Sequence, residues 1–221
     1  MVPIKQMLAN RANYGGMRST SAARYLVIHY TGNDWDSAES NGTYFQKNVT
    51  KTSAHYFVDD DSIVQSVPDN YTAYAVGGVS SYKHPSCRNS NSISIEICDM
   101  TKNGKVYPTE KTIQNAAELT LKLMKKYKIP ITNVIRHYDV TGKNCPAYWV
   151  KDPKGWEAFK KRVLEADEVV EKSKMIVDGK EVEVERILKD GKNYVWIRSI
   201  GEQLGYEIGN KGNIAVLTSK K

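Results

Sequence analysis

The sequence predicts an α/β fold with a central mixed β-sheet flanked by helices, and a small β-rich C-terminal domain. Three observations predict it. Over residues 1–165, short β-branched runs alternate with segments of helical periodicity, which is the pattern of an α/β domain. Residues 166–174 are charged and contain no aromatic residue or proline, so we predict a linker there. Residues 175–221 contain two hairpin patterns with glycine turns, which are typical of a β-rich module.

The composition limits the class of protein. The 221 residues are 40% hydrophobic and carry 32 Lys plus Arg against 25 Asp plus Glu, a net charge of +7. This content supports a hydrophobic core and excludes intrinsic disorder as the main description. A basic protein favours polyanionic partners, either nucleic acid or an anionic polymer or surface. Three cysteines cannot all pair within one chain, so we expect at least one to be free or metal-bound.

The first part of the chain predicts a strand, a helix and a hairpin in that order. Residues 25–31 read Tyr-Leu-Val-Ile-His-Tyr-Thr and precede Gly-Asn-Asp, as in a buried strand that ends in a turn. Residues 37–50 predict a short helix. Residues 54–58 and 63–67 flank an acidic turn and predict a β-hairpin. Residues 69–91 are rich in Gly, Ser, Asn and Tyr and predict a long loop, a feature that is often functional.

The next strand is predicted by strict alternation over residues 91–98. Ile93, Ile95 and Ile97 fall on one face and Glu96 on the other, because successive strand residues point to opposite sides. The isoleucines are therefore expected to face the core, with Glu96 on the opposite face.

Two helices and one strand complete the larger domain. Residues 109–127 place apolar side chains at helical spacing and predict an amphipathic helix. Residues 133–138 predict a short strand, residues 139–146 a loop, and the segment from Pro153 a helix that begins with proline.

The C-terminal module is predicted to be mostly hairpins. Residues 175–184 surround an Asp178–Gly179 turn, and residues 206–217 form a second hairpin with a glycine turn. Between them, residues 194–204 predict a strand that leads into a short helix.

Three side chains are candidate metal ligands: His29, His137 and Cys145. Each lies at a predicted strand end or in the loop that follows one, which is where α/β folds assemble sites. Two imidazoles, one thiolate and a water describe a catalytic zinc site, whereas structural zinc sites use four protein ligands. Spacing alone leaves this open, since a lone histidine is more often a hydrogen-bonded core residue. Cys98 also remains a competing ligand by residue type.

Four segments together carry a family resemblance. Residues 25–32, 53–59, 91–98 and 136–146 resemble, in this order, blocks of the zinc-dependent N-acetylmuramoyl-L-alanine amidases. This type 2 amidase family is related to peptidoglycan-recognition proteins and is common among cell-wall lytic enzymes of phages and bacilli. The resemblance spans about residues 3–165. Its most specific part is a histidine followed by Gly-Lys-x-Cys-Pro.

The resemblance implies hydrolysis of the bond between N-acetylmuramic acid and L-alanine in peptidoglycan, with Zn²⁺ as cofactor. By this likeness His29, His137 and Cys145 are the zinc ligands. Glu96 and Lys143 match the catalytic carboxylate and lysine. Glu96 is expected to accept a proton from water and pass it to the leaving amine, and Lys143 to stabilise charge on the carbonyl oxygen.

Substrate contacts are expected from the long loop. Tyr74 stands where many relatives have an aromatic residue, and Arg88 and Asn91 are polar candidates at the end of the loop. The chain also departs from the family pattern. Ala75 occupies a position where many relatives carry histidine, and Ala54 one where some carry a catalytic tyrosine.

The C-terminal module resembles the small domain found at the N-terminus of copper amine oxidases and in Gram-positive surface proteins. It contains no histidine, so copper binding is not expected. We expect a cell-wall-binding role, with Trp196 and Tyr206 as possible contacts. The alternative is a stabilising or dimerising appendage, with Trp196 in the core.

These inferences define the expected partners and location. Bacterial peptidoglycan and anionic wall polymers are the expected partners, without nucleic acid and without membrane insertion. No run approaches the roughly 20 apolar residues of a membrane span, and no signal peptide is recognised. We therefore expect synthesis in a bacterial host cytoplasm and holin-type release to the wall, as for an endolysin. A bacterial autolysin is the alternative. The alternatives are a non-catalytic peptidoglycan-binding protein and a Cys-His cell-wall peptidase with Cys145 as nucleophile.

Overall fold

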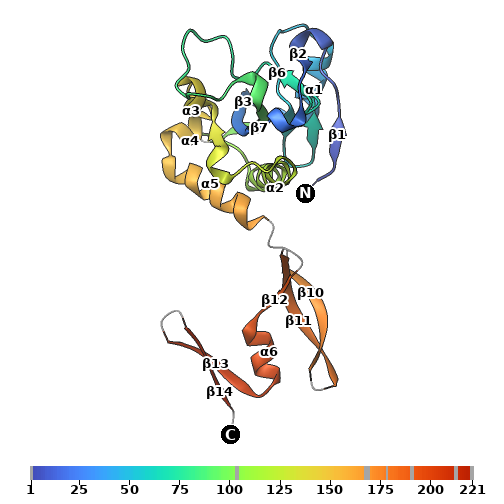
Figure 1. Cartoon of the computed structure of the whole chain (residues 1–221), viewed down its shortest axis with the longest axis vertical. Coiled ribbons are helices and arrows are strands. Elements are labelled where there is room, and N and C mark those ends of the chain that lie inside the picture. Colours follow the sequence, from blue (N-terminus) through green and yellow to red (C-terminus); the bar gives the residue numbers. More distant parts are fainter. Residues whose placement is uncertain are drawn as a thin grey trace. The chain divides into compact units, whose positions relative to one another are not determined.

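Seven strands of the described residues pair into one mixed sheet in the computed structural model of the chain (Figure 1). The structure describes residues 2–102, 105–166, 170–177, 179–189, 192–211 and 214–219. The strands are β1 (Ile4–Gln6), β3 (Tyr25–Asp34), β4 (Tyr56–Val58), β5 (Ile63–Gln65), β7 (Ser92–Lys102), β8 (Lys105–Tyr107) and β9 (Val134–Arg136). The order is β1-β5-β4-β7-β3-β9, with β8 beside β7. β4, β7, β3 and β9 are mutually parallel, while β4–β5 and β7–β8 are antiparallel. The predicted mixed α/β fold is confirmed.

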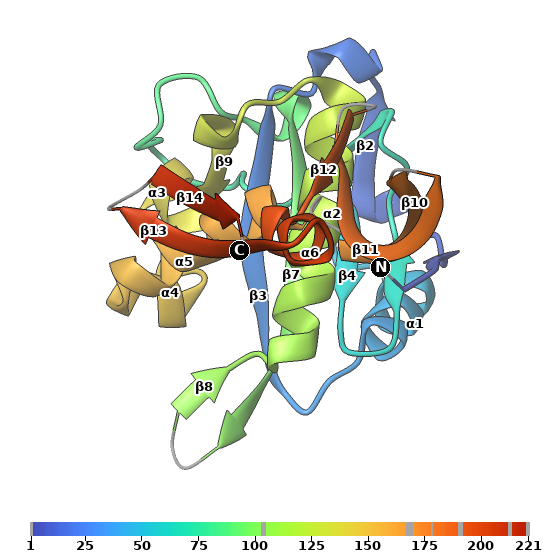
Figure 2. The same cartoon turned by 90° about the horizontal axis from the view of Figure 1, so that it is seen from below.

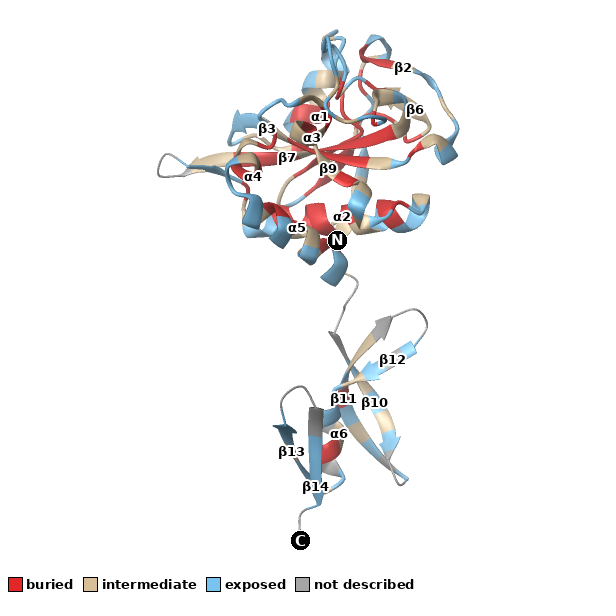
Figure 3. Cartoon of the chain, turned by 60° about the vertical axis from the view of Figure 1, so that its left-hand side comes forward, coloured by how far each residue is buried: buried red, intermediate tan, exposed pale blue. Residues whose placement is uncertain are grey.

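Helices cover both faces of this sheet. The three isoleucines of β7 pack with side chains of α2 (Glu110–Tyr127) and α5 (Pro153–Glu165) in the largest core cluster. On the opposite face, α1 (Ala38–Lys47) packs on Phe57, Val64 and Cys98. Strands β4, β5 and β7 are accordingly buried along most of their length (Figure 3). The face of β7 that carries Glu96 is therefore covered as well.

The helices begin where the sequence provides caps. Thr109 Oγ1 accepts a hydrogen bond from the N–H of Thr112 at 3.0 Å and starts α2. Ser37 and Ser40 form a reciprocal capping box at α1, and Pro153 occupies the first turn of α5. These contacts confirm the three predicted helices. None of the helices in the described ranges is long and apolar enough to cross a membrane.

Several short elements depart from the prediction. The segment expected as one long loop contains β6 (Tyr71–Ala73), which pairs with β2 (Tyr14–Met17). The strand expected over 133–138 ends at Arg136, and α3 (His137–Thr141) occupies the start of the expected loop 139–146. The other short helices between residues 2 and 166 are η1 (Arg11–Asn13), η2 (Thr20–Ala22), η3 (Asn89–Asn91), η4 (Ile131–Asn133) and α4 (Ala147–Lys151).

An acidic cap explains why a helix begins at His137. The Asp139 carboxylate accepts hydrogen bonds from the backbone N–H of Arg136 at 2.9 Å and from its guanidinium at 2.7 and 3.0 Å. This contact satisfies an N–H group at the helix start and favours a negative charge there. The strand-to-helix change therefore falls directly at a candidate ligand.

The chain divides into two compact units, Met1–Ala166 and Asp167–Lys221. The second unit contains β10 (Val170–Val177), β11 (Lys180–Lys189), β12 (Lys192–Val195), α6 (Ile197–Gln203), β13 (Tyr206–Lys211) and β14 (Ile214–Ser219). Both expected hairpins are present, as β10–β11 and β13–β14.

Two details of this unit differ from the sequence prediction. Strand β10 begins at Val170, within the segment 166–174 that was expected to be a linker. Its pairing with β11 extends to Val170 opposite Ile187, which explains the longer strand. Of the expected Asp178–Gly179 turn, Gly179 has a positive φ of 79° and Asp178 lies outside the described residues.

Candidate metal centre

His29, His137 and Cys145 converge at one end of the sheet. One ligand atom from each lies within 4.8 Å of the others, and all three side chains are buried. The register explains the approach of the two histidines. Strands β3 and β9 are parallel partners up to Ile28 and Arg136. His29 and His137 each follow directly after these paired residues, so they lie side by side. Their ring centroids are 4.6 Å apart.

The protonation state and the unpartnered nitrogens of the two histidines fit a bound metal ion. Burial lowers the pKa of His29 well below its usual value and that of His137 to about 4, so both imidazoles are neutral, as metal binding requires. His29 Nε2 and His137 Nδ1 are buried without a hydrogen-bond partner among the described residues. Such orphaned atoms are costly unless a ligand satisfies them. Two imidazole nitrogens and one sulfur are the donor set that zinc accepts.

Glu96 lies beside this group. It is the register partner of His29 on β7, and its Oε1 is 3.7 Å from His29 Nδ1. Burial raises the pKa of Glu96 to about 8, an effect that the nearby Lys143 opposes. The side chain remains 20% exposed, so the carboxylate is accessible from the adjoining pocket.

A pocket of about 240 Å³ connects these side chains to solvent. Its lining comprises His29, Tyr30, Thr31, Phe45, Thr52, Ser53, Ala54, Phe57, Tyr74, Ala75, Glu96, His137, Lys143 and Cys145. The structure thus brings the three candidate ligands, Glu96, Lys143 and Tyr74 into one cavity. Ala54 and Ala75 line it with small side chains.

Arg88 and Asn91 are placed differently. The Arg88 guanidinium donates to the carbonyl oxygens of His84 and Cys87 and stacks on Tyr82. Asn91 Oδ1 accepts from the backbone N–H of Arg88, and its amide donates to the carbonyl oxygen of Ser86. Both side chains hold the loop before β7, and neither lines the pocket.

Cys98, the competing ligand by residue type, lies apart from the histidines. It packs with Ala38 and Phe57 under α1, and its Sγ accepts a hydrogen bond from the Asn41 amide at 3.7 Å.

Sequence reasoning did not select Phe45, Phe57, Thr52 or Ser53 as site residues. Their signal was weak, because these residues reach the pocket only through the packing of α1 and the segment before β4.

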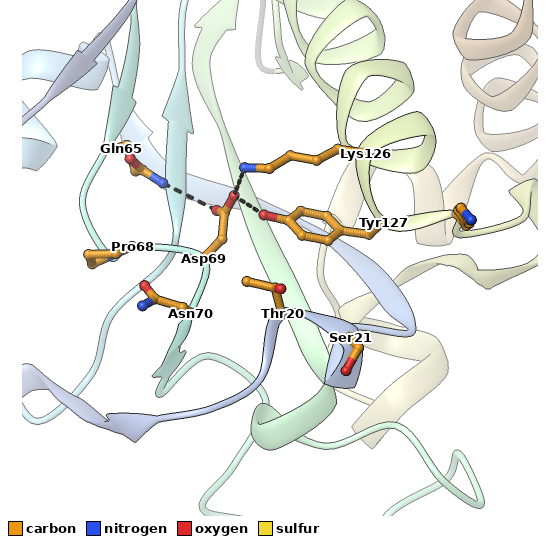
Figure 4. A pocket seen from close by; sticks show the side chains of 9 residues that line it. Thr20, Ser21, Gln65, Pro68, Asp69, Asn70, Lys126 and Tyr127 are labelled. Atoms are coloured by element: carbon orange, nitrogen blue, oxygen red, sulfur yellow. Dashed lines mark hydrogen bonds and ion pairs between the residues drawn. The ribbon is translucent and has the colours of Figure 1, made fainter.

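A larger cavity of about 640 Å³ lies near the C-terminal end of α2 (Figure 4). Its central Asp69 is already fully engaged. The carboxylate accepts hydrogen bonds from Gln65 at 3.2 Å, from Lys126 at 2.9 Å, and from the hydroxyls of Tyr56 and Tyr127. Asp69 therefore connects α2 to the segment after β5. Its carboxylate has a structural role and is not available as a catalytic group.

Comparisons with known proteins show the family to which the chain is similar. A family profile described as N-acetylmuramoyl-L-alanine amidase matches residues 19–148, more than half of the chain. The N-acetylmuramoyl-L-alanine amidase CwlL of Bacillus licheniformis is 34% identical over 190 residues, covering 81% of this chain and 52% of CwlL. The chain spans about half the length of the curated relatives it matches.

Solved structures of similar sequence share the fold of the larger unit. The solution structure of the PlyG catalytic domain is 30% identical with a TM-score of 0.62, covering 75% of this chain and 95% of that domain. The catalytic domain of XlyA is 29% identical with a TM-score of 0.60, covering 73% of this chain and 99% of that domain.

Proposed function

The chain belongs to the N-acetylmuramoyl-L-alanine amidase family, and we propose that it hydrolyses the amide bond between N-acetylmuramic acid and L-alanine in bacterial peptidoglycan. One observation carries the proposal. The donor atoms of His29, His137 and Cys145 gather within 4.8 Å in the pocket that also contains Glu96 and Lys143. This arrangement combines a metal-binding set with an acid–base group and a cationic group, as amide hydrolysis requires.

Zinc is the proposed cofactor, held by His29, His137 and Cys145. The orphaned imidazole nitrogens and the buried thiol fit its preference for nitrogen and sulfur ligands. When bound, zinc supplies Lewis-acid chemistry, since it polarises a carbonyl and makes water acidic near neutral pH. Three protein ligands leave a coordination position open, as in catalytic sites.

Glu96 is the proposed proton carrier. Its Oε2 is buried without a hydrogen-bond partner among the described residues, so this oxygen is free to accept a proton from the attacking water. Glu96 would then deliver this proton to the leaving nitrogen of L-alanine, and the burial that raises its pKa favours the protonated form after the first transfer.

Lys143 is the proposed stabiliser of the carbonyl oxygen. Its side chain is exposed and lines the pocket. Its charge adds to burial in lowering the pKa of both histidines and opposes the burial that raises the pKa of Glu96. An ammonium group so close to the reacting amide offsets the negative charge that develops on the oxygen. Tyr74 lines the same pocket and is proposed to contact the substrate.

The pKa of Cys145 argues against a thiol peptidase. Burial, and then the charge of Glu96, raise the pKa of this thiol to about 12, whereas a cysteine nucleophile requires a lowered pKa. A metal ligand has no such conflict, because the metal itself stabilises the thiolate.

The second unit is proposed to attach the enzyme to the cell wall. Tyr194, Trp196 and Tyr206 are exposed, and aromatic side chains of this kind bind sugar and polymer surfaces through their apolar faces. Peptidoglycan and anionic wall polymers are the proposed partners, in agreement with the net charge of +7. The proposed setting is that of an endolysin or autolysin that acts at the wall.

The proposed reaction has a direct test. Purified peptidoglycan is incubated with zinc-loaded chain and with chelator-treated chain, and newly exposed amino termini are identified. We expect L-alanine to be released as the new amino terminus, with activity lost on chelation and restored by zinc. A different new terminus, or full activity after complete zinc removal, would overturn the proposal.

A further inference from the structure

The loop between β6 and η3 carries a lysine close to the candidate metal centre. Figure 2 shows this loop, residues 74–88, next to β9 and α3, and Figure 1 agrees. The N–H groups of Lys83 and His84 both donate to the carbonyl oxygen of Val140 on α3, at 2.9 and 3.1 Å. The loop is therefore fixed to the helix that begins with the candidate ligand His137.

Contacts within the loop hold its backbone in one arrangement. His84 Nδ1 accepts hydrogen bonds from the N–H groups of Ser86 and Cys87 at 3.2 and 2.9 Å. The Arg88 guanidinium donates to the carbonyl oxygens of His84 and Cys87 at 3.0 and 2.7 Å. A side chain on this loop therefore has a defined place relative to α3 before any ligand binds, which lowers the cost of binding.

The side chain of Lys83 extends along α3 toward the loop that contains Lys143. Its Nζ lies 3.9 Å from the ring centroid of Tyr138, the residue after His137. Its Cδ lies 3.9 Å from the position that a Cβ on Gly142 would occupy. Gly142 thus contacts Lys83 and is bonded to Lys143, which brings the two lysines to the same side of the pocket.

The charge of Lys83 is not neutralised by a neighbour. The side chain is exposed, and its ammonium pairs with no carboxylate among the described residues. The Tyr138 ring orients the ammonium through a cation–π contact, which leaves the charge in place. Arg136, which also lies over Tyr138 at 5.4 Å, is by contrast paired with Asp139 at 2.7 Å. Lys83 is therefore a positioned cation that can still accept an anionic partner.

The position of Lys83 relative to the pocket suggests which part of a substrate it meets. The pocket lining includes His137 and Lys143 but not Lys83. The ammonium of Lys83 therefore lies beyond the groups proposed to act on the scissile amide. A substrate group several bonds away from that amide is the partner that this placement favours.

We propose that Lys83 is a specificity-determining residue, which binds a carboxylate on the stem-peptide residue that follows L-alanine. The inference rests on the proposed amidase function, because that function defines L-alanine as the first residue of the stem. A hydrogen bond between an ammonium and a carboxylate is charge-assisted, and such pairs select partners by charge. The enzyme therefore prefers stem peptides that carry an acid after L-alanine over peptides that carry the corresponding amide.

A pair of substrates isolates this contact. Two synthetic disaccharide peptides carry either D-glutamate or its α-amide, D-isoglutamine, after L-alanine and are otherwise identical. The zinc-loaded full chain is assayed on both by release of the L-alanine amino terminus, which gives kcat and KM. Lys83→Ala and Lys83→Arg are compared with Lys154→Ala, which removes an exposed lysine of α5.

We expect the wild type and Lys154→Ala to show a kcat/KM about threefold to fivefold higher for the acid than for the amide, as for an exposed ion pair. Lys83→Ala should lose this preference through a higher KM for the acid, with hydrolysis of the amide unchanged. Lys83→Arg should keep the preference, and added salt should reduce it in the wild type. Unchanged hydrolysis of the amide by Lys83→Ala also establishes that the loop and the pocket remain intact.

Two results would overturn the inference alone. One is an equal kcat/KM of the wild type for the two substrates, and the other is an equal loss on both substrates in Lys83→Ala. Failure of the proposed function gives a different result, because the wild type would then release no L-alanine amino terminus from either substrate. That result would overturn the amidase proposal and the role of Lys83 with it.

Discussion

His29 and Glu96 are direct register partners on the parallel strands β3 and β7, with His29 Nδ1 3.7 Å from Glu96 Oε1. Both strands are buried in the sheet centre, between β4 and β9. A proposed metal ligand and the proposed proton carrier are therefore held by backbone hydrogen bonds rather than by a mobile loop. Such support on rigid elements keeps reacting groups in position.

Replacing the proposed thiolate ligand should weaken zinc binding. We expect Cys145→Ser to lower zinc affinity about 10–100-fold or more, because a hydroxyl is a poor substitute for a thiolate. Zinc content after dialysis measures the effect. The control is Cys98→Ser, also buried but packed under α1. Equal zinc content in Cys145→Ser and the wild type would remove Cys145 from the site.

Glu96→Gln should retain zinc and lose most activity. The amide keeps the shape of the side chain but cannot carry the proton, so we expect kcat to fall by about 10²–10⁴-fold. Metal analysis and peptidoglycan hydrolysis are measured on the same preparation. Glu157→Gln on the exposed surface of α5 is the matched control. Near-normal turnover by the metal-loaded Glu96→Gln protein would exclude the proton-carrier role.

Lys143→Ala should reduce kcat more than it changes KM, because the proposed contact forms with charge that develops during the reaction. Loss of one such donor costs about 10²–10³-fold in kcat. Lys143→Arg should recover part of the rate, and Lys154→Ala, exposed on α5, should leave it unchanged. An effect confined to KM would instead indicate uniform substrate binding.

Stability should fall in acid through His55. Burial first, and then the charge of Arg18, lower the pKa of this side chain from 6.5 to about 3, and the N–H of Ser94 donates to its Nδ1 at 3.1 Å. Above its ordinary pKa the residue is neutral in both states and adds no pH dependence. Below it, the unfolded chain binds a proton that the folded chain excludes, so the free energy of unfolding decreases.

The size of this acid effect can be measured with urea. Between about pH 7 and pH 5, His55 should remove about 2 kcal/mol from the free energy of unfolding. His55→Gln should be less stable at neutral pH but show a shallower loss over the same range. Identical pH slopes for the two zinc-loaded proteins would contradict the assignment.

Removal of the second unit should separate hydrolysis from attachment. The fragment that ends at Ala166 contains the complete pocket and the largest core cluster. We expect it to hydrolyse dispersed peptidoglycan at the rate of the full chain and to pellet less with intact walls. Equal pelleting by both proteins would remove the wall-binding role of the second unit.

The sequence was most informative where side-chain periodicity was long. The alternation of Ile93, Ile95 and Ile97 predicted a strand, and all three are fully buried. The helical spacing after Thr109 predicted α2, and Thr109 is its cap. Each of these patterns extends over enough residues for one period to dominate.

Short elements and long-range contacts were not predictable in this way. Strands β2 and β6 are only four and three residues long, too short to show a period, and each is formed by pairing with the other. His137 was predicted to lie in a strand, but the capping contact of Asp139 makes it the first residue of a helix. The register of β3 and β7 shifts between Tyr30 and Asp34, and this irregularity has no separate signal in the sequence.

The register of β3 and β7 also limits which length changes the chain can accept. One residue inserted or deleted between Tyr25 and His29 would turn His29 toward the face that α2 covers, because side chains alternate along a strand. The same shift would expose Leu26 and Ile28, both now fully buried, to the pocket face. These strands should therefore accept many substitutions that preserve volume, while an insertion or deletion of a single residue should abolish both folding and metal binding.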